Sequence, residues 1–350
     1  MDVPVRAPES DPPNTPLSAL AAGATRQVDG LLDRVRGHYW TLAPYLAHRV
    51  RPVVPPPSVP FSTIVHDPTY GPLEITGHLH ERAGADTCAI LVHGLGGDAK
   101  SYYMIEAAEA ALGVGISALR LNLRGADHKT PDYYHAGLTD DLRAACTSAQ
   151  LAKYRALVLL GYSIGGHVVL RFLTEGAKPR VTSGAAVCPP LAIEASAREI
   201  DRPRSLPYRK YLLAGLLEMY RYIAAQRPVP VSVRDAAKIK TIHDWDDQIV
   251  APRFHFDGAE HYWHSASVAP RLGLLCRPTL VVVSRHDPMV AWSSVHPYLE
   301  RRDAVETVLL DRGGHVGFPP KVQLGVNDSP VRGSVHRQVL EWLVSRRPRA

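Results

Sequence analysis

The feature that most constrains the fold of this chain is an alternation of short apolar, strand-like runs with helix-like segments. Strands are predicted at 61–66, 73–80, 87–93, 116–124, 155–161, 181–188, 279–285 and 305–310. Helices are predicted near 102–112, 139–152, 164–175, 292–300 and 333–346. Short apolar strands separated by helices are typical of a mostly parallel sheet that helices cover on both faces. The pattern therefore predicts an α/β fold.

The alternation stops over residues 189–277, where we find helix-like and aromatic-rich sequence but no convincing strand. We interpret this segment as an insertion folded over one edge of the sheet and call it the cap. Residues 1–24 are predicted to form a disordered tail, and residues 25–60 a helical segment with a proline-rich linker, ahead of a main domain at 61–350. Six apolar residues of the helical segment recur near helical spacing, and we expect them to pack against the core, with contact to a membrane surface as the alternative: Val28, Leu31, Leu32, Val35, Tyr39 and Leu42.

The composition is that of a soluble globular protein, with 45% hydrophobic and 21% charged residues. No run approaches the roughly 18 apolar residues of a membrane-spanning helix, and the start of the chain lacks a secretory signal, so we expect a cytoplasmic protein. The net charge of +6 is scattered along the chain and no nucleic-acid-binding module accompanies it, so no nucleic-acid partner is predicted. The four cysteines are widely spaced, which favours buried thiols over disulfides or a zinc site.

The segment GYSIGGHVVL places Ser163 between two glycines, directly after the strand-like RALVLLG and before a helix-like run. This is the strand–turn–helix setting of a nucleophile elbow, in which flanking glycines leave room for the backbone of a tight turn. A serine hydroxyl is a weak nucleophile at neutral pH and needs a base that a third group orients. Ser163 is therefore the predicted nucleophile, provided that the chain also offers an acid and a histidine.

Both partners are found after later strands, where ligands bind in open α/β sheets. Asp287 directly follows the run TLVVVSR, and His315 follows the last strand on the glycine-rich loop DRGGHVGF. The order Ser163, Asp287, His315 is that of the α/β-hydrolase arrangement. Asp311 is an alternative orienting acid, because it also lies at a strand end and close to His315.

The negative charge that develops during acyl transfer requires preorganised backbone donors. We predict the N–H groups of Leu95, in the glycine-rich loop HGLGGDA, and of Ile164, which follows the nucleophile. His93 is expected to brace that loop. The cap is expected to supply the substrate pocket, with these candidates: Tyr208, Tyr211, Met219, Trp245 and Phe254.

The sequence also raises three other possible functions. The segment GLGGDA at 94–99 also fits a dinucleotide-binding pattern, but no acidic residue that would hold a ribose ends the next strand. Seventeen histidines suggest a metal enzyme, yet neither HExxH nor a third ligand at recognisable spacing is present. A non-catalytic ligand-binding scaffold remains an alternative, although all three triad residues are present. No cofactor and no metal are predicted.

Residues 60–346 resemble the α/β-hydrolase superfamily, and within it the YheT-like carboxylesterases. The resemblance is carried by LVHGLGGDAKSYY, LNLRGADHKTPDYYHAGLTDDLRAA, LLGYSIGGHVVLRF, SRHDPMV, GGHVGF and above all by DWDDQIVAPRFHFDGAEHYWHSAS. It implies an eight-stranded sheet with a helical cap, a triad of Ser163, Asp287 and His315, and hydrolysis of small-molecule esters with short to medium acyl chains. Thioesterase, lipase or acyltransferase chemistry on the same triad remains open. Arg124 and His135 lie in shared segments, and we expect structural roles for them; the oligomeric state is not predicted.

Overall fold

The computed structural model describes residues 17–176, 179–299, 305–327 and 333–346, and it describes the backbone alone for 17–29. Eight strands form one sheet in the order β1-β2-β4-β3-β5-β6-β7-β8. Strands β3 to β8 are parallel, whereas β2 pairs antiparallel with β1 and with β4. The predicted mostly parallel, eight-stranded fold is confirmed, with these bounds: β1 Val59–Asp67, β2 Gly71–His80, β3 Thr87–Val92, β4 Ser117–Leu121, β5 Ala156–Tyr162, β6 Val181–Val187, β7 Thr279–Ser284 and β8 Glu306–Leu310.

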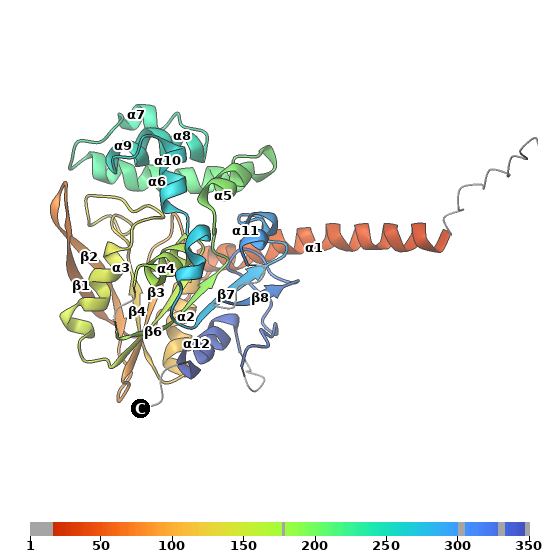
Figure 1. The fold of residues 1–350 in the computed structure, drawn as a ribbon, viewed down its shortest axis with the longest axis horizontal. Coiled ribbons are helices and arrows are strands. Elements are labelled where there is room, and N and C mark those ends of the chain that lie inside the picture. The colour runs from red at the N-terminus through yellow and green to blue at the C-terminus, as the bar shows by residue number, and fades with distance from the viewer. Residues whose placement is uncertain (1–16, 177–178, 300–304, 328–332, 347–350) are drawn as a thin grey trace, which may run out of the picture.

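Helices cover both faces of the sheet, which explains why a central strand such as β3 is apolar on both faces rather than alternating. All six residues of β3 are buried: Cys88, Ile90 and Val92 belong to the core on one face, and Ala89 and Leu91 to the core on the other. The first face is covered by α3 and α4, and the second by α2 and α12 (Figure 1). The bounds are α2 Tyr102–Gly113, α3 Asp140–Thr147, η1 Ala149–Leu151, α4 Ile164–Thr174, α11 Trp292–Leu299 and α12 Val335–Ser345.

The chain between β6 and β7 forms a layer of helices that gathers at one end of the sheet (Figure 1). Residues with hydroxyl side chains begin two of these helices: the Ser232 hydroxyl accepts the Asp235 N–H, and the Thr241 hydroxyl accepts the Asp244 N–H. The bounds within the cap are α5 Ile193–Ile200, η2 Pro203–Ser205, α6 Leu206–Ala224, α7 Val233–Ala236, α8 Ile242–Trp245, η3 Asp246–Val250, α9 Ala251–Arg253, α10 Ala259–Ala266 and η4 Ala269–Leu274.

A long helix, α1 (Leu17–Val50), precedes the sheet and extends away from the rest of the molecule (Figure 1). The tail predicted for residues 1–24 is wrong for 17–24, where the alanine-rich LSALAAGA favours a helix; residues 1–16 lie outside the described part. The core packing expected for the six apolar residues of the helical segment is also wrong, because Leu31, Val35 and Tyr39 are 62%, 58% and 58% exposed. Leu32 and Leu42 are exposed as well, and the side chain of Val28 is not described. The helix packs on the body through another face, which includes Gly37 and Thr41.

No helix in the described part of the chain combines the length and the apolar character that a bilayer-spanning segment needs. Cys88, Cys146 and Cys188 are buried, as expected, whereas Cys276 is exposed.

Candidate active site

Ser163 lies at the tight turn between β5 and α4, where its backbone φ is +52° and its ψ is −122°. Non-glycine residues seldom adopt this conformation, which concentrates at functional sites. The surrounding glycines are required sterically: a Cβ on Gly161 would lie 2.2 Å from the carbonyl oxygen of Gly165, and a Cβ on Gly165 would lie 2.3 Å from that of His93. The strand–turn–helix setting expected for GYSIGG is therefore present.

Asp287 and His315 meet after β7 and β8, and both are buried. His315 Nδ1 lies 2.8 Å from Asp287 Oδ2, while Asp287 Oδ1 accepts the N–H groups of Met289 and Val290 at 2.8 and 2.9 Å. Three hydrogen bonds thus fix the carboxylate, which holds the imidazole through Nδ1 and leaves Nε2 for other contacts. This is the arrangement in which a carboxylate orients a histidine base.

The alternative acid Asp311 and His336 make different contacts. Asp311 is exposed, and its carboxylate accepts a hydrogen bond from Arg285 Nε at 2.7 Å. His336 lies on α12, 2.7 Å from the Tyr162 hydroxyl. The Asp287 carboxylate is therefore the one that contacts His315.

Helix α1 supports the His315 loop, a contact that the sequence reasoning missed. The His315 N–H donates to Thr41 Oγ1 at 2.8 Å, and Thr41 Oγ1 donates to the Gly37 carbonyl at 2.8 Å. A Cβ on Gly314 would lie 2.4 Å from the Gly37 carbonyl oxygen, and one on Gly317 would lie 2.1 Å from that of Trp40. The glycines of the loop therefore admit the close approach of α1. Thr41 and His315 are 274 positions apart, so no local pattern pointed to this contact.

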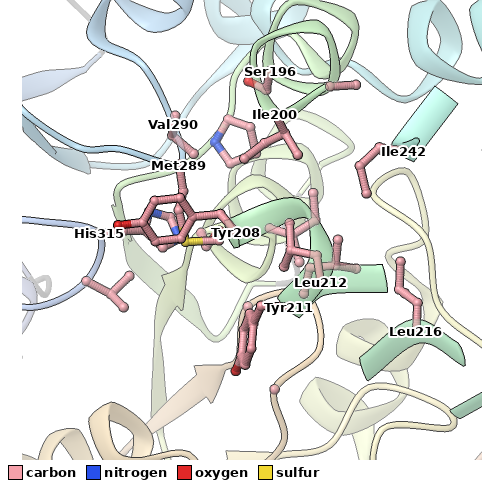
Figure 2. A pocket seen from close by; sticks show the side chains of 18 of the residues that line it. Ser196, Ile200, Tyr208, Tyr211, Leu212, Leu216, Ile242, Met289, Val290 and His315 are labelled. Carbon is pink, nitrogen blue, oxygen red and sulfur yellow. The ribbon is translucent and has the colours of Figure 1, made fainter. Parts of the chain in front are cut away.

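Ser163 and His315 line the same cavity, which has a volume of about 450 Å³. Leu95, Ile164 and four of the five predicted cap residues also line it. Phe254 does not, because its ring packs on that of His135 with centroids 4.3 Å apart. Figure 2 shows His315 and Ile242 on opposite sides of the cavity, with side chains of α6 between them. The cap residues in the wall are Tyr208, Tyr211, Met219 and Trp245.

The loop after β3 is held rigidly on both sides of Leu95. The Gly94 N–H donates to the Tyr103 hydroxyl, and the Gly96 N–H donates to the Tyr134 hydroxyl, each at 3.0 Å. His93 braces this loop as expected: its Nδ1 lies 2.9 Å from the Gly94 carbonyl oxygen, and its Nε2 accepts the Leu123 N–H. The rigid loop thus fixes the position of the Leu95 backbone beside the cavity.

A buried acid, Asp246, lies in the cavity wall on the cap side. Burial raises the pKa of its carboxyl to about 7, and the negative charge of Asp201 also raises it. The Trp263 Nε1–H, which donates to Asp246 Oδ2 at 2.7 Å, and nearby His243 lower the pKa but do not offset the effect of burial. Between about pH 4 and pH 7, the folded protein therefore keeps a proton on Asp246 that the unfolded chain, with an aspartate pKa of about 3.9, has released. The carboxyl contributes its full stability below about pH 4 and loses it as the pH rises through about 7.

Replacing Asp246 with asparagine is expected to raise stability relative to wild type at pH 8 and to raise it less at pH 5. Asparagine cannot ionise, and its carbonyl still accepts the Trp263 N–H. Urea unfolding of both proteins at the two pH values measures the effect. An equal difference between the proteins at pH 5 and pH 8 would show that the carboxyl does not titrate in this range.

Cys188, Asp287 and His315 offer ligand atoms that lie within 4.8 Å of one another, a spacing that a metal ion could bridge. Burial, followed by the charge of Asp287, raises the pKa of the Cys188 thiol well above its usual value. A metal binds the thiolate, and the environment of Cys188 disfavours that form. The residues therefore fit a hydrogen-bonded acid–base pair better than a metal centre.

Arg124 lies in a buried charge cluster under the cap. It donates to Asp67, Asp132 and Asp141, with the contact from Nη2 to Asp141 Oδ1 at 2.6 Å. From the cap, Arg253 donates to Asp132 through Nε and Nη2 at 2.9 and 2.7 Å. Two arginines and three aspartates thus join β1, the loop after β4, α3 and the cap. The structural role expected for Arg124 is met by these contacts.

His135 lies in a different setting, on the cavity wall. Burial, with nearby Arg124 and Arg171, lowers the pKa of its imidazole to about 3, so the ring is neutral near pH 7. The ring packs among Phe254, Phe256 and Tyr262.

Comparison with known proteins agrees with this fold. Residues 89–321, about two thirds of the chain, match the model of the alpha/beta hydrolase family. The alpha/beta hydrolase GrgF from Penicillium sp. sh18 superposes with a TM-score of 0.51 at 16% identity, over 74% of this chain and 91% of that one. At this identity the likeness concerns the fold alone.

Two curated relatives have names that state an activity. The putative esterase YheT of Escherichia coli is 27% identical over 65% of this chain and 69% of its own length. The monoacylglycerol lipase of Saccharomyces cerevisiae is 27% identical over 65% of this chain and 54% of its own length, so this chain spans about half of that protein. From the family match and these relatives we conclude that the chain belongs to the alpha/beta hydrolase family, with YheT-like esterases among its relatives.

Proposed function

We propose that this protein is a serine hydrolase that cleaves carboxylic esters through an acyl-enzyme. The observation that carries the proposal is that Ser163, at a strained turn, and His315, paired with Asp287, line one cavity. A hydroxyl nucleophile, a base and an orienting carboxylate, placed here after β5, β8 and β7, are the parts that acyl transfer requires.

In the proposed reaction, Ser163 Oγ attacks the ester carbonyl carbon while His315 Nε2 takes the hydroxyl proton. Asp287 stabilises the imidazolium that results. The N–H groups of Leu95 and Ile164 donate to the carbonyl oxygen as it becomes negative. His315 then gives the proton to the departing alcohol as its bond to the acyl carbon breaks. A water loses a proton to His315 and attacks the acyl carbon, the bond from Ser163 Oγ to that carbon breaks, and His315 returns the proton to Ser163 Oγ as the acid leaves.

The cavity walls support an acyl chain as the buried part of the substrate. Side chains of α6 and of the following cap helices line it with aliphatic and aromatic groups, among them Leu212, Leu216 and Met219. Apolar surface of this kind favours the transfer of a hydrocarbon chain from water. A volume of about 450 Å³ suits acyl chains of short to medium length. The printed names of both curated relatives agree with an ester substrate.

Labelling with an alkyl fluorophosphonate tests the proposal directly. The activated serine oxygen displaces fluoride from phosphorus and forms a stable phosphonate ester, so a single adduct is expected. Trypsin should release it on the peptide 156–171, whose only serine is Ser163. The internal control is Ser196, which also lines the cavity but falls on the peptide 181–198. An adduct on 181–198, or none on 156–171, would contradict the assignment.

A further inference from the structure

A row of large apolar side chains is exposed along α1. Of the thirteen exposed large hydrophobic side chains in the described part of the chain, seven lie on this helix. Helical geometry places them within a sector of about 100°. We call this set the α1 stripe: Leu31, Leu32, Val35, Tyr39, Leu42, Leu46 and Val50. Contiguous exposed apolar surface of this kind marks an interaction site.

The stripe is continuous with the exposed part of the cavity wall, which we take as the cavity entrance. Leu42 belongs to the stripe and also lines the cavity. Tyr45, about one helical turn further on, lines the cavity but is not part of the stripe. The Tyr45 ring packs edge-on against Tyr211, a cavity residue that is 45% exposed. The opposite side of α1 is fixed at Gly37 and Thr41 against the His315 loop. The orientation of the stripe relative to the cavity is therefore set by close packing.

The charges around the stripe favour an anionic lipid surface over a second copy of this chain as its partner. Residues 30–51 carry four arginines, all of them exposed, and a single acidic residue, Asp33. A second copy of the helix would bring these arginines near their counterparts, which costs free energy because like charges repel. An anionic lipid surface attracts them and also accepts the apolar side chains beside them. Arginine flanking an apolar face with an exposed tyrosine is typical of a helix that lies in a membrane interface.

We propose that α1 docks this protein on anionic lipid surfaces and so brings the cavity entrance to esters held there. The second half of this inference rests on the proposed function, whereas the docking does not. The helix lies along the surface with the α1 stripe inserted, rather than crossing the bilayer. An acyl ester then passes from the lipid surface into the cavity past Leu42 and Tyr211.

Vesicle co-sedimentation of the full chain tests the docking. Vesicles of phosphatidylcholine with phosphatidylglycerol should bind the protein, and vesicles of phosphatidylcholine alone should bind it more weakly. The variant Leu31→Glu, Val35→Glu, Leu46→Glu should bind the anionic vesicles roughly tenfold or more weakly, because three inserted apolar contacts are lost. These three residues do not line the cavity. The matched control adds the same charge at exposed apolar positions elsewhere, Val59→Glu, Ile64→Glu, Leu274→Glu, and should bind as wild type does.

Three results would overturn the proposal: no vesicle binding by wild type, an equal loss in the control, or dimerisation without lipid that only the α1 stripe variant abolishes. The last result would make a second copy the partner. Hydrolysis of a soluble aryl ester is measured in parallel, and all three proteins should match. Loss of this activity in every protein, with vesicle binding intact, would reject the proposed function but leave the docking standing.

Discussion

Replacing Ser163 with alanine is expected to lower kcat for aryl esters by roughly a thousandfold or more, because the nucleophile of the acyl-enzyme is lost. Alanine retains the Cβ that already occupies the turn at φ +52°, so the backbone conformation is no more strained than in wild type. The unfolding midpoint in urea should therefore change little. Initial rates with a series of 4-nitrophenyl esters of increasing acyl length give the measurement.

The matched control is Ser196→Ala, which removes a second serine hydroxyl from the wall of the same cavity. The buried Ser196 Oγ makes no hydrogen bond in the described structure, so its loss should change kcat little. Equal activity of wild type and Ser163→Ala would reject the assignment. Inactivity of all three proteins toward every ester would favour the ligand-binding scaffold instead.

The fold was predictable because its evidence is local. Each parallel strand is buried on both faces and therefore appears as a short apolar run, as in TCAILV and ALVLLGY. The glycines around Ser163 were also informative, because Gly161 and Gly165 have no space for a Cβ. In a parallel sheet the carboxyl ends of the strands share one edge, so strand order alone suggested that Asp287 and His315 would meet.

Long-range contacts could not be predicted in the same way. Helical spacing on α1 identified an apolar face but could not say whether that face meets the core or solvent, and here the packed face is the one with Gly37 and Thr41. Phe254 illustrates the same limit. Its aromatic ring suited a substrate pocket, yet its neighbours place it behind the wall, against His135. Which side of a cavity wall a side chain occupies depends on tertiary packing.

Replacing Arg124 with methionine is expected to destabilise the protein by about 3–5 kcal/mol, because it removes one partner from a buried ion cluster. Arg124 is 1% exposed. In the methionine variant the Asp141 carboxylate still accepts the backbone N–H of residue 124 at 2.9 Å. It loses the Nε and Nη2 donors of the Arg124 guanidinium. Arg253 would then be the arginine that still pairs with Asp67 and Asp132. A domain is usually stable by only about 5–15 kcal/mol, so this loss is a large share of the total.

Urea unfolding of Arg124→Met and of Arg198→Met compares the free energy lost with a buried ion pair with the free energy lost with an exposed ion pair. Arg198 also pairs with a carboxylate, that of Glu194 at 2.8 Å, but both side chains are more than half exposed. Its loss should cost less than about 1 kcal/mol, because water solvates the remaining carboxylate. Arg124→Lys should fall between wild type and Arg124→Met, since an ammonium keeps the charge but cannot match the planar fork that reaches three aspartates. Similar free energies of unfolding for the two methionine variants would mean that the buried cluster contributes no more than a surface pair. The cap, which joins the cluster through Arg253, would then have to be held chiefly by its apolar contacts.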